Sequence, residues 1–341
     1  MRVKARVAII TAFLVVFPFA FAHAADLRLI GSGASFPFPL YSAWFKDFSR
    51  RTAGVTVDYQ AKGSGAGIQD LVNKTVDFAA SDAAMTPEQI AQVPGGVVLL
   101  PMTAGEIVLA YNLPGLNSPL KLPRDVYPEI FLGKVTQWND PRIVAANPGV
   151  TLPNLPITVV RRSDASGTTF VFTKHLSAIS PAFREKVGFG TTVPWPQSDK
   201  LVAAPKNDGV TATIKQTPGA IGYIEYGYAK LTKAATALLQ NKSGQFVAPG
   251  DASGAAALAS AELPEDLIAW IDDPKSPESY PIVSFTWLLL YKKQDPQKAE
   301  ALRKLVAYGL TDGQKLSDRM GYIPLPKNVI EKVTAASAKV Q

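Results

Sequence analysis

Short apolar runs alternate along the chain with segments of helical periodicity, and this pattern predicts an α/β fold. Five runs that are apolar or alternate between apolar and polar residues predict strands, at 27–30, 55–59, 76–82, 105–112 and 157–160. Leu40, Trp44 and Phe48 recur at the spacing of one helix face, as do Thr169, Phe172 and Leu176. Both sets follow a predicted strand, which is the order of elements in α/β proteins.

The second half of the chain continues this alternation. Helices are predicted at 124–132, 141–146, 180–187 and 210–216, with a strand at 220–224. The apolar run 282–291 is too long for an edge strand and too short to span a membrane. We interpret it as a strand that crosses between two lobes, followed by a helix through Leu302, Leu305 and Val306 that returns to the first lobe. Two lobes also suit the length of the chain, which exceeds the usual limit for a single core.

Loops rich in small residues join strands to helices at three places, at 31–37, 63–67 and 163–168. In an open α/β sheet such loops lie at the carboxyl ends of the strands, where ligands bind. Neither glycine cluster is a nucleotide motif: Gly31-x-Gly33 lacks the third glycine of the dinucleotide fingerprint, and no Gly-Lys-Ser/Thr occurs.

The third loop carries a basic pair, Arg161 and Arg162, that leaves a strand just before a helix begins. Free backbone N–H groups, the positive end of the helix dipole and a guanidinium fork together suit an oxyanion. A second interpretation stays open on this segment alone. Asp164 or Ser166 could simply cap the helix, with both arginines in solvent.

Two further polar positions lie near the same sheet edge. Asp82 ends the strand predicted at 76–82, and it either faces the loops or caps a turn. Asn207 and Asp208 precede the helix predicted at 210–216; they either border the ligand site or cap the helix, and the cap is the favoured interpretation.

The first 24 residues have the features of a secretory signal peptide. Arg2, Lys4 and Arg6 precede an apolar run over 7–22, and Ala22-His23-Ala24 offers a small-x-small cleavage site. The alternative is an uncleaved membrane anchor, for which the apolar run is short. Cleavage before Ala25 removes three basic residues and no acidic one, so the formal charge falls from +7 to +4. With no run of five like charges, nucleic acid is not an expected partner.

Cysteine is absent and histidine is rare. An exported chain without cysteine has no disulfide framework, no thiolate metal site and no lipid-modified N-terminal cysteine. His175 is the one histidine left once His23 is removed with the signal peptide, so we expect no metal site and no cofactor. These features predict a soluble protein of a bacterial periplasm.

Five motifs resemble the phosphate-binding proteins of bacterial high-affinity phosphate ABC importers. They lie at 33–37, 77–82, 130–140, 161–168 and 218–223, in the family's order, within a similarity that runs from about Leu27 to about Ala335. Two are specific: the Arg-Arg-x-Asp-x-Ser-Gly-Thr loop and the Leu-Gly-Lys…Trp-x-Asp segment.

The resemblance implies a two-lobe periplasmic binding protein fold, type II-like, with phosphate in the interlobe cleft. We expect one lobe from 25–104 and 285–341 and the other from 105–284. The positions that match the family's phosphate-binding residues are Ser35, Phe36, Ser64, Asp82, Arg162, Asp164, Ser166, Gly167 and Thr168.

Roles for these residues come from the same resemblance. Asp82 matches the aspartate that accepts a hydrogen bond from the bound ion, and Asp164 is expected to orient Arg162. Three positions depart from the commonest pattern: Ser35 replaces threonine, Ala165 stands where glycine is frequent, and Gly65-Ala66 replaces Ser-Gly.

The expected function is capture of inorganic phosphate and its delivery to the permease subunits of an ABC importer, by a monomer that is not an enzyme. Two alternatives remain open. The protein could bind sulfate or another oxyanion on the same fold, or it could be a periplasmic phosphoesterase, which would need an activated nucleophile or paired metals.

Overall fold

The computed structural model describes residues 26–259 and 261–341, so the predicted signal peptide lies outside the described residues. One sheet runs through the molecule in the order β2-β1-β3-β12-β4-β8-β6-β7, and β9 pairs with β4 beside this path. Its strands are β1 (Leu27–Gly33), β2 (Val55–Ala61), β3 (Phe78–Ser81), β4 (Val97–Tyr111), β6 (Thr158–Arg162), β7 (Leu201–Ala204), β8 (Ala220–Glu225), β9 (Ala235–Thr236) and β12 (Val283–Tyr291). A small second sheet contains β5 (Lys121–Leu122), β10 (Leu238–Gln240) and β11 (Phe246–Val247).

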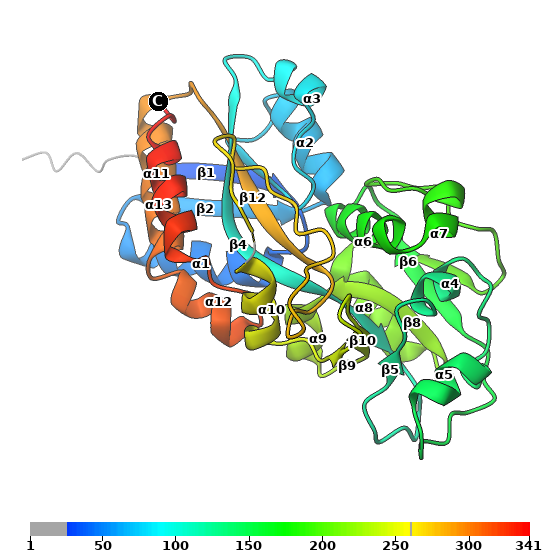
Figure 1. Cartoon of the computed structure of the whole chain (residues 1–341). Helices are drawn as coiled ribbons and strands as arrows, with labels where there is room; N and C mark the ends of the chain where they lie inside the picture. The colour runs from blue at the N-terminus through cyan, green and yellow to red at the C-terminus, as the bar shows by residue number, and fades with distance from the viewer. Residues whose placement is uncertain (1–25, 260) are drawn as a thin grey trace, which may run out of the picture.

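The long strand β4 connects the two lobes of the molecule (Figure 1). Its first part, Val97–Glu106, pairs with β12, and its last part, Ile107–Tyr111, pairs with β8. We call the half of the sheet with β1–β3 and β12 the first lobe, and the half with β6–β8 the second lobe. The residue boundaries predicted for the lobes stay a prediction.

Strand β4 is longer than the strand predicted at 105–112. All 15 of its residues are buried, so no alternation of exposed positions marks where the strand begins. Pro101 does not end it, because the register between β4 and β12 shifts at this point and a bulge accommodates a residue without an N–H.

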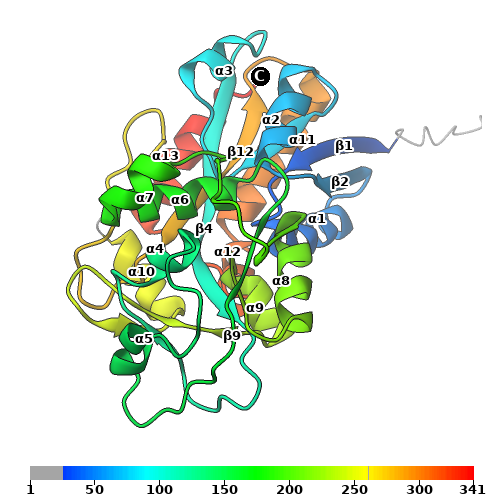
Figure 2. The same ribbon diagram turned by 90° about the vertical axis from the view of Figure 1, so that its right-hand side faces the viewer.

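Helices cover both lobes (Figure 2). The first lobe carries α1 (Phe38–Arg51), α2 (Ser64–Val72), α3 (Pro87–Ala91), α11 (Pro296–Leu310), α12 (Gln314–Met320) and α13 (Lys327–Ser337). The predicted face of Leu40, Trp44 and Phe48 is buried, and so is that of α11, which packs near β1. The chain therefore returns to the first lobe after β12, as its periodicity predicts.

The second lobe carries α4 (Tyr127–Phe131), α5 (Pro141–Ala146), α6 (Gly167–Ile179), α7 (Pro181–Lys186), α8 (Lys206–Gln216) and α9 (Tyr226–Thr232), and α10 (Asp251–Leu258) lies near the crossover. Helix α4 is shorter than the 124–132 predicted for it, since Pro128 lacks the N–H that a helix beginning at residue 124 would use. Within 26–259 and 261–341 no helix is long and apolar enough to cross a membrane.

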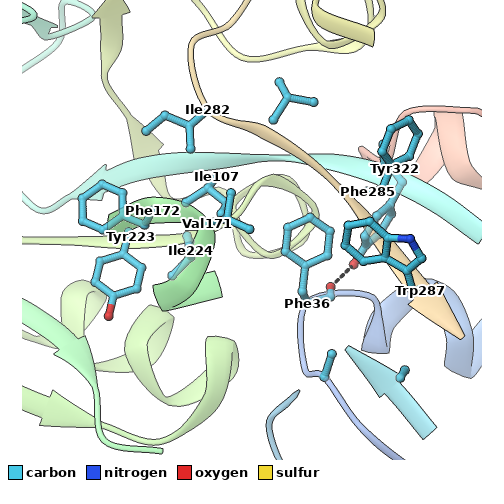
Figure 3. Packing of buried hydrophobic residues seen from close by; sticks show 14 of the residues in the cluster. Phe36, Ile107, Val171, Phe172, Tyr223, Ile224, Ile282, Phe285, Trp287 and Tyr322 are labelled. Atoms are coloured by element: carbon cyan, nitrogen blue, oxygen red, sulfur yellow. Dashed lines mark hydrogen bonds between the residues drawn. The ribbon is translucent and has the colours of Figure 1, made fainter. Parts of the chain in front are cut away.

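Buried aromatic side chains hold the centre of the molecule on both sides of Ile107 (Figure 3). On the first-lobe side the Phe36 ring meets Tyr322 edge-on, and the Tyr322 hydroxyl donates to the Phe36 carbonyl at 2.8 Å. On the second-lobe side Phe172 stacks on Tyr223 with ring centroids 4.4 Å apart. The loop after β1 and the start of α6 are therefore both anchored to a packed core.

Candidate functional site

Three loops that follow parallel strands meet where the lobes touch. The Gly65 N–H, at the start of α2, donates to the Ala165 carbonyl of the second lobe at 3.0 Å. Glycines make this approach possible: a Cβ at Gly63 would lie 2.4 Å from Asp164 Oδ2, and one at Gly167 would lie 2.4 Å from Ser64 Oγ. Gly63 also has a φ of +99°, a conformation that side chains disfavour.

Arg162 is buried at the end of β6 and paired with Asp164. Its Nε donates to Asp164 Oδ1 at 2.8 Å and its Nη2 to Oδ2 at 2.5 Å, while Nη1 lies 3.3 Å from Thr168 Oγ1. Burial alone would raise the pKa of Asp164, but the hydrogen bonds and charge of Arg162 hold it below its ordinary value. Asp164 therefore fixes the guanidinium with one edge toward the start of α6, and Arg162 is not in solvent.

The start of α6 combines both interpretations offered by the sequence. Ser166 is the N-cap, and its hydroxyl oxygen accepts from the Thr169 N–H at 3.0 Å. Gly167 and Thr168 are the first helical residues, whose N–H groups have no partner within the helix and lie at the positive end of its dipole. The cap thus leaves the N–H groups of an anion cradle in place.

Asp82 faces this cradle from the first lobe. Thr286 Oγ1 of β12 donates to Asp82 Oδ1 at 2.8 Å. The backbone N–H of Asp82 donates to Ser64 Oγ at 3.2 Å. Asp82 Oδ2 would lie 2.7 Å from a Cβ at Gly167. Among the described residues, the hydrogen bonds to its carboxyl oxygens come from the hydroxyls of Thr286 and Ser64 and not from a backbone N–H of a helix or turn, so the alternative of a cap is wrong.

The surroundings of Asp82 raise its pKa to about 7, mainly because the carboxyl is fully buried. The hydrogen bond from Thr286, the charge of Arg162 and the hydrogen bond from Ser64 oppose this rise. Asp82 can therefore gain or lose a proton near neutral pH.

Ser35 and Phe36 are held by groups from distant parts of the chain. Asn207 donates to Ser35 Oγ from its backbone N at 3.1 Å and from Nδ2 at 3.0 Å. The Tyr228 hydroxyl donates to the Ser35 carbonyl at 2.6 Å. The cap favoured for Asn207 is wrong, because α8 already begins at Lys206 and Asn207 points inward to the site.

Comparisons with known proteins agree with this architecture. Residues 21–312 match a family model described as a PBP superfamily domain. The chain is 39% identical over 312 residues to the phosphate-binding protein PstS of Pasteurella multocida, covering 90% of this chain and 89% of the relative. The PstS protein of Haemophilus influenzae is 38% identical over 320 residues, with 93% of both chains covered. The chain belongs to the PstS family.

Solved structures show the same fold at lower sequence identity. A high affinity periplasmic phosphate-binding protein bound with phosphate has a TM-score of 0.74 and 22% identity, covering 91% of this chain and 93% of that chain. A phosphate-binding protein from Stenotrophomonas maltophilia has a TM-score of 0.72 and 20% identity, covering 90% and 93%. The predicted two-lobe α/β fold and the resemblance to PstS proteins are both confirmed.

All nine residues that match the PstS motifs meet at the junction between the lobes. Eight are buried, and Asp164 is partly exposed. Contacts run from Ser35 through Asn207 to Thr168 and Arg162, and from Gly167 to Ser64 and Asp82. Their roles toward a ligand stay a prediction.

Sequence reasoning missed the residues that support these nine. Thr286 in β12, Tyr228 in α9 and Tyr322 after α12 lie far along the chain, and their residue types give no local signal of the site. Asn207 does carry a signal, because its position just before a predicted helix allows it to border the ligand site, the less favoured of its two interpretations.

Two other observations bear on the chemistry. Within 26–259 and 261–341 no group of three or more His, Asp or Glu side chains could hold a metal ion. A cavity of about 380 Å³ opens on the second lobe, but its walls include Ile130, Phe131 and Leu201 and it lies away from Arg162. The buried polar junction is the better candidate for binding an oxyanion.

Proposed function

We propose that this protein binds inorganic phosphate between its lobes and delivers it to the membrane permease of an ABC importer. The observation that carries the proposal is one buried cluster that combines a fixed guanidinium, a helix N-terminus and several hydroxyls with the carboxyl of Asp82. Its relatives are named phosphate-binding proteins, which supports the same ligand.

The donors of the cluster suit a tetrahedral oxyanion. Arg162 contributes a charged fork whose orientation Asp164 sets, and α6 contributes N–H groups at Gly167 and Thr168. The buried hydroxyls of Ser35, Ser64, Ser166 and Thr168 add further hydrogen-bond donors. Such fixed dipoles replace the water that a buried anion loses.

Asp82 explains why the ion should be phosphate rather than sulfate. At neutral pH every phosphate ion carries at least one O–H, whereas sulfate carries none. With a pKa near 7, Asp82 can accept that proton in a charge-assisted hydrogen bond or share it with the ion. Sulfate would place a lone pair and a like charge against the carboxylate, which disfavours it.

Motion between the lobes would admit and release the ion. Strand β4 links the lobes, and contacts such as Gly65 to Ala165 form only when the lobes meet. We propose that phosphate stabilises the closed form, which a permease then recognises. The proposed lobe boundaries at 104/105 and 284/285 face each other on paired strands, two residues before β4 changes its partner between Glu106 and Ile107.

The same proposal includes the compartment and the oligomeric state of the protein. We infer export to a periplasm through a signal peptide over 1–24, and action as a monomer without cofactor or catalysis. A binder of another oxyanion and a phosphoesterase are the competing functions, and a binding assay paired with a turnover assay separates them.

Calorimetry on the purified mature protein, first stripped of ligand and treated with a chelator, tests the proposal. We expect saturable heat of binding with phosphate well below millimolar concentration, much weaker binding of sulfate, and no hydrolysis of a generic phosphate ester. Absence of binding below millimolar phosphate would refute the function, and ester turnover would favour the phosphoesterase.

A further inference from the structure

Asn207 occupies a central position in the site that no family motif assigned to it. It is fully buried on α8 of the second lobe, between Ser35 of the first lobe and Thr168 at the start of α6. Its side chain makes three hydrogen bonds, to Ser35, Thr168 and the backbone of Glu225. Any role of Asn207 toward a ligand rests on the proposed phosphate-binding function.

The backbone of Glu225 determines which way the Asn207 amide points. The Glu225 N–H lies 3.0 Å from Asn207 Oδ1, and a backbone N–H can only donate, so the atom that faces it must be the amide oxygen. The NH₂ group is therefore turned toward the two hydroxyls. Because Glu225 also pairs with Ile107 in the sheet, this orientation is anchored at the crossover of β4.

The hydroxyl of Ser35 has both of its acceptor positions filled by Asn207. It accepts from the Asn207 backbone N at 3.1 Å and from Nδ2 at 3.0 Å. A hydroxyl has two lone pairs and one proton, so the proton of Ser35 is left to donate to a further group.

The hydroxyl of Thr168 is in the same condition. It accepts from Asn207 Nδ2 at 3.2 Å and from Arg162 Nη1 at 3.3 Å. Its proton, too, is left to donate to a further group. One amide thus turns two hydroxyls, one from each lobe, into hydrogen-bond donors.

We propose that Asn207 is a positioning residue that directs the hydroxyl protons of Ser35 and Thr168 toward bound phosphate. Ser35 belongs to the first lobe and Asn207 to the second, so the alignment is complete only when the lobes are closed. Phosphate then meets donors whose direction is already set, without reorientation of either hydroxyl.

Substitutions at Asn207 test this role against a merely structural one. Asn207→Asp keeps the shape but makes the side chain an acceptor-only carboxylate. Both hydroxyls then donate to it instead of to phosphate, and its charge repels the anion, so we expect the Kd for phosphate to rise more than a hundredfold. Asn207→Ala leaves the hydroxyls undirected, and we expect a rise of 10- to 50-fold. Calorimetry measures the Kd of each variant, and thermal unfolding of the ligand-free variants shows whether they fold.

Asn147 provides a matched control in the same lobe. It is a buried asparagine whose side chain also makes three hydrogen bonds, with Lys121 N, Lys121 O and Ile143 O, away from the site. Asn147→Ala should lower the unfolding temperature while the phosphate Kd stays within threefold of the wild type.

A double-mutant cycle isolates the action through the hydroxyls. In a Ser35→Ala, Thr168→Val background we expect Asn207→Ala to change Kd less than threefold, since no hydroxyl proton remains to be directed. Equal effects of Asn207→Ala in the two backgrounds, or a Kd within threefold of the wild type for folded Asn207→Asp, would overturn the proposal. If Asn207→Ala does not fold, Asn207→Leu, which is similar in shape and uncharged, carries the same cycle. Failure of the wild type to bind phosphate would instead refute the proposed function.

Discussion

Two clusters of buried polar side chains lie where the lobes join, and they differ in the balance of donors and acceptors. The first is the candidate site around Asp82 and Arg162. The second, the crossover carboxyls Glu106 and Glu225, lies where β4 leaves β12 and joins β8. Both clusters contain a buried acid with a raised pKa.

In the part of the chain that the structure describes, no cation pairs with the crossover carboxyls, and neutral donors hold Glu106. Glu106 accepts from the Gly250 N–H at 2.7 Å and from Ser253 Oγ at 2.8 Å, and burial raises its pKa to about 8. Burial also raises the pKa of Glu225 well above its ordinary value, and the nearby Glu106 raises it further. Glu106 is therefore mainly a neutral acid near pH 7, and burial favours the neutral form of Glu225 as well.

At the candidate site there are more hydrogen-bond donors than protein acceptors to receive them. Arg162 is a cation, the first N–H groups of α6 have no partner within the helix, and the hydroxyl protons of Ser35 and Thr168 are left to donate to a ligand. A surplus of fixed donors around one acid favours binding of an anion, whereas an acid neutralised by its own proton needs no ligand. A raised pKa alone does not distinguish the two clusters, because both contain an acid with this property.

Removing the cation should have the largest effect on this contrast. Arg162→Ala should weaken phosphate binding by about 2–5 kcal/mol, because it also leaves Asp164 without its buried partner. Arg162→Lys keeps the charge but loses the fork, so we expect a smaller loss. Calorimetry measures both.

Arg124→Ala is the matched control for these variants. Arg124 makes a similar two-point pair with Asp273, at 2.6 and 2.7 Å, away from the site. Phosphate affinity close to the wild-type value should accompany this change. Wild-type affinity in both Arg162 variants would remove that residue from the site.

Changing the acid at the site should alter selectivity more than affinity. Asp82→Asn keeps the shape, removes the charge and can donate as well as accept. We expect it to retain phosphate binding and to lose much of the discrimination against sulfate, which in the wild type should be on the order of 3 kcal/mol. Competitive calorimetry measures the ratio of the two affinities. A wild type that binds sulfate as well as phosphate would contradict the role of Asp82.

Closure of the lobes offers a smaller, structural effect. Phosphate should reduce the radius of gyration of the stripped protein in small-angle scattering, because binding between the lobes draws them together about the crossover of β4. Gly167→Ala should prevent this compaction, since its Cβ would lie 2.4 Å from Ser64 Oγ. An unchanged profile for the saturated wild type would count against a hinge, though not against binding.

Changing an acid at the crossover should leave binding almost unaltered and affect the pH dependence of stability. The pKa of Glu106 rises from 4.5 to about 8 on folding, so the folded state holds a proton that the unfolded state loses between these values. Its contribution to stability is therefore full below about pH 4.5 and declines as the pH rises to about 8. Glu106→Gln should flatten this decline in the unfolding free energy of the ligand-free protein.

Calorimetry on the same variant completes the contrast. We expect the phosphate Kd of Glu106→Gln to stay within about threefold of the wild type, because Gly250 and Ser253, rather than the site, contact the Glu106 carboxyl. A large loss of affinity at unchanged stability would mean that the crossover carboxyls belong to the binding machinery.

The sequence by itself determined the local parts of this protein. Strand-to-helix loops with Gly63, Ser166 and Gly167 form from neighbouring residues, and such loops meet at one sheet edge by the rule of α/β topology. The buried face of α1 likewise follows from its periodicity. For this reason all nine residues matched to the family's motifs lie together.

Only the tertiary structure decided the environment of those residues. Thr286 reaches Asp82 from 204 positions along the chain, and Asn207 reaches Ser35 from 172 positions away. Their residue types are common and no sequence spacing predicts these contacts, because both depend on how distant segments pack. Strand β12 lies beside β3 within the first lobe, and α8 meets the loop after β1 across the lobes. The raised pKa of Asp82 and the direction of the Ser35 and Thr168 protons result from that packing, which places acid, amide and hydroxyls out of water together.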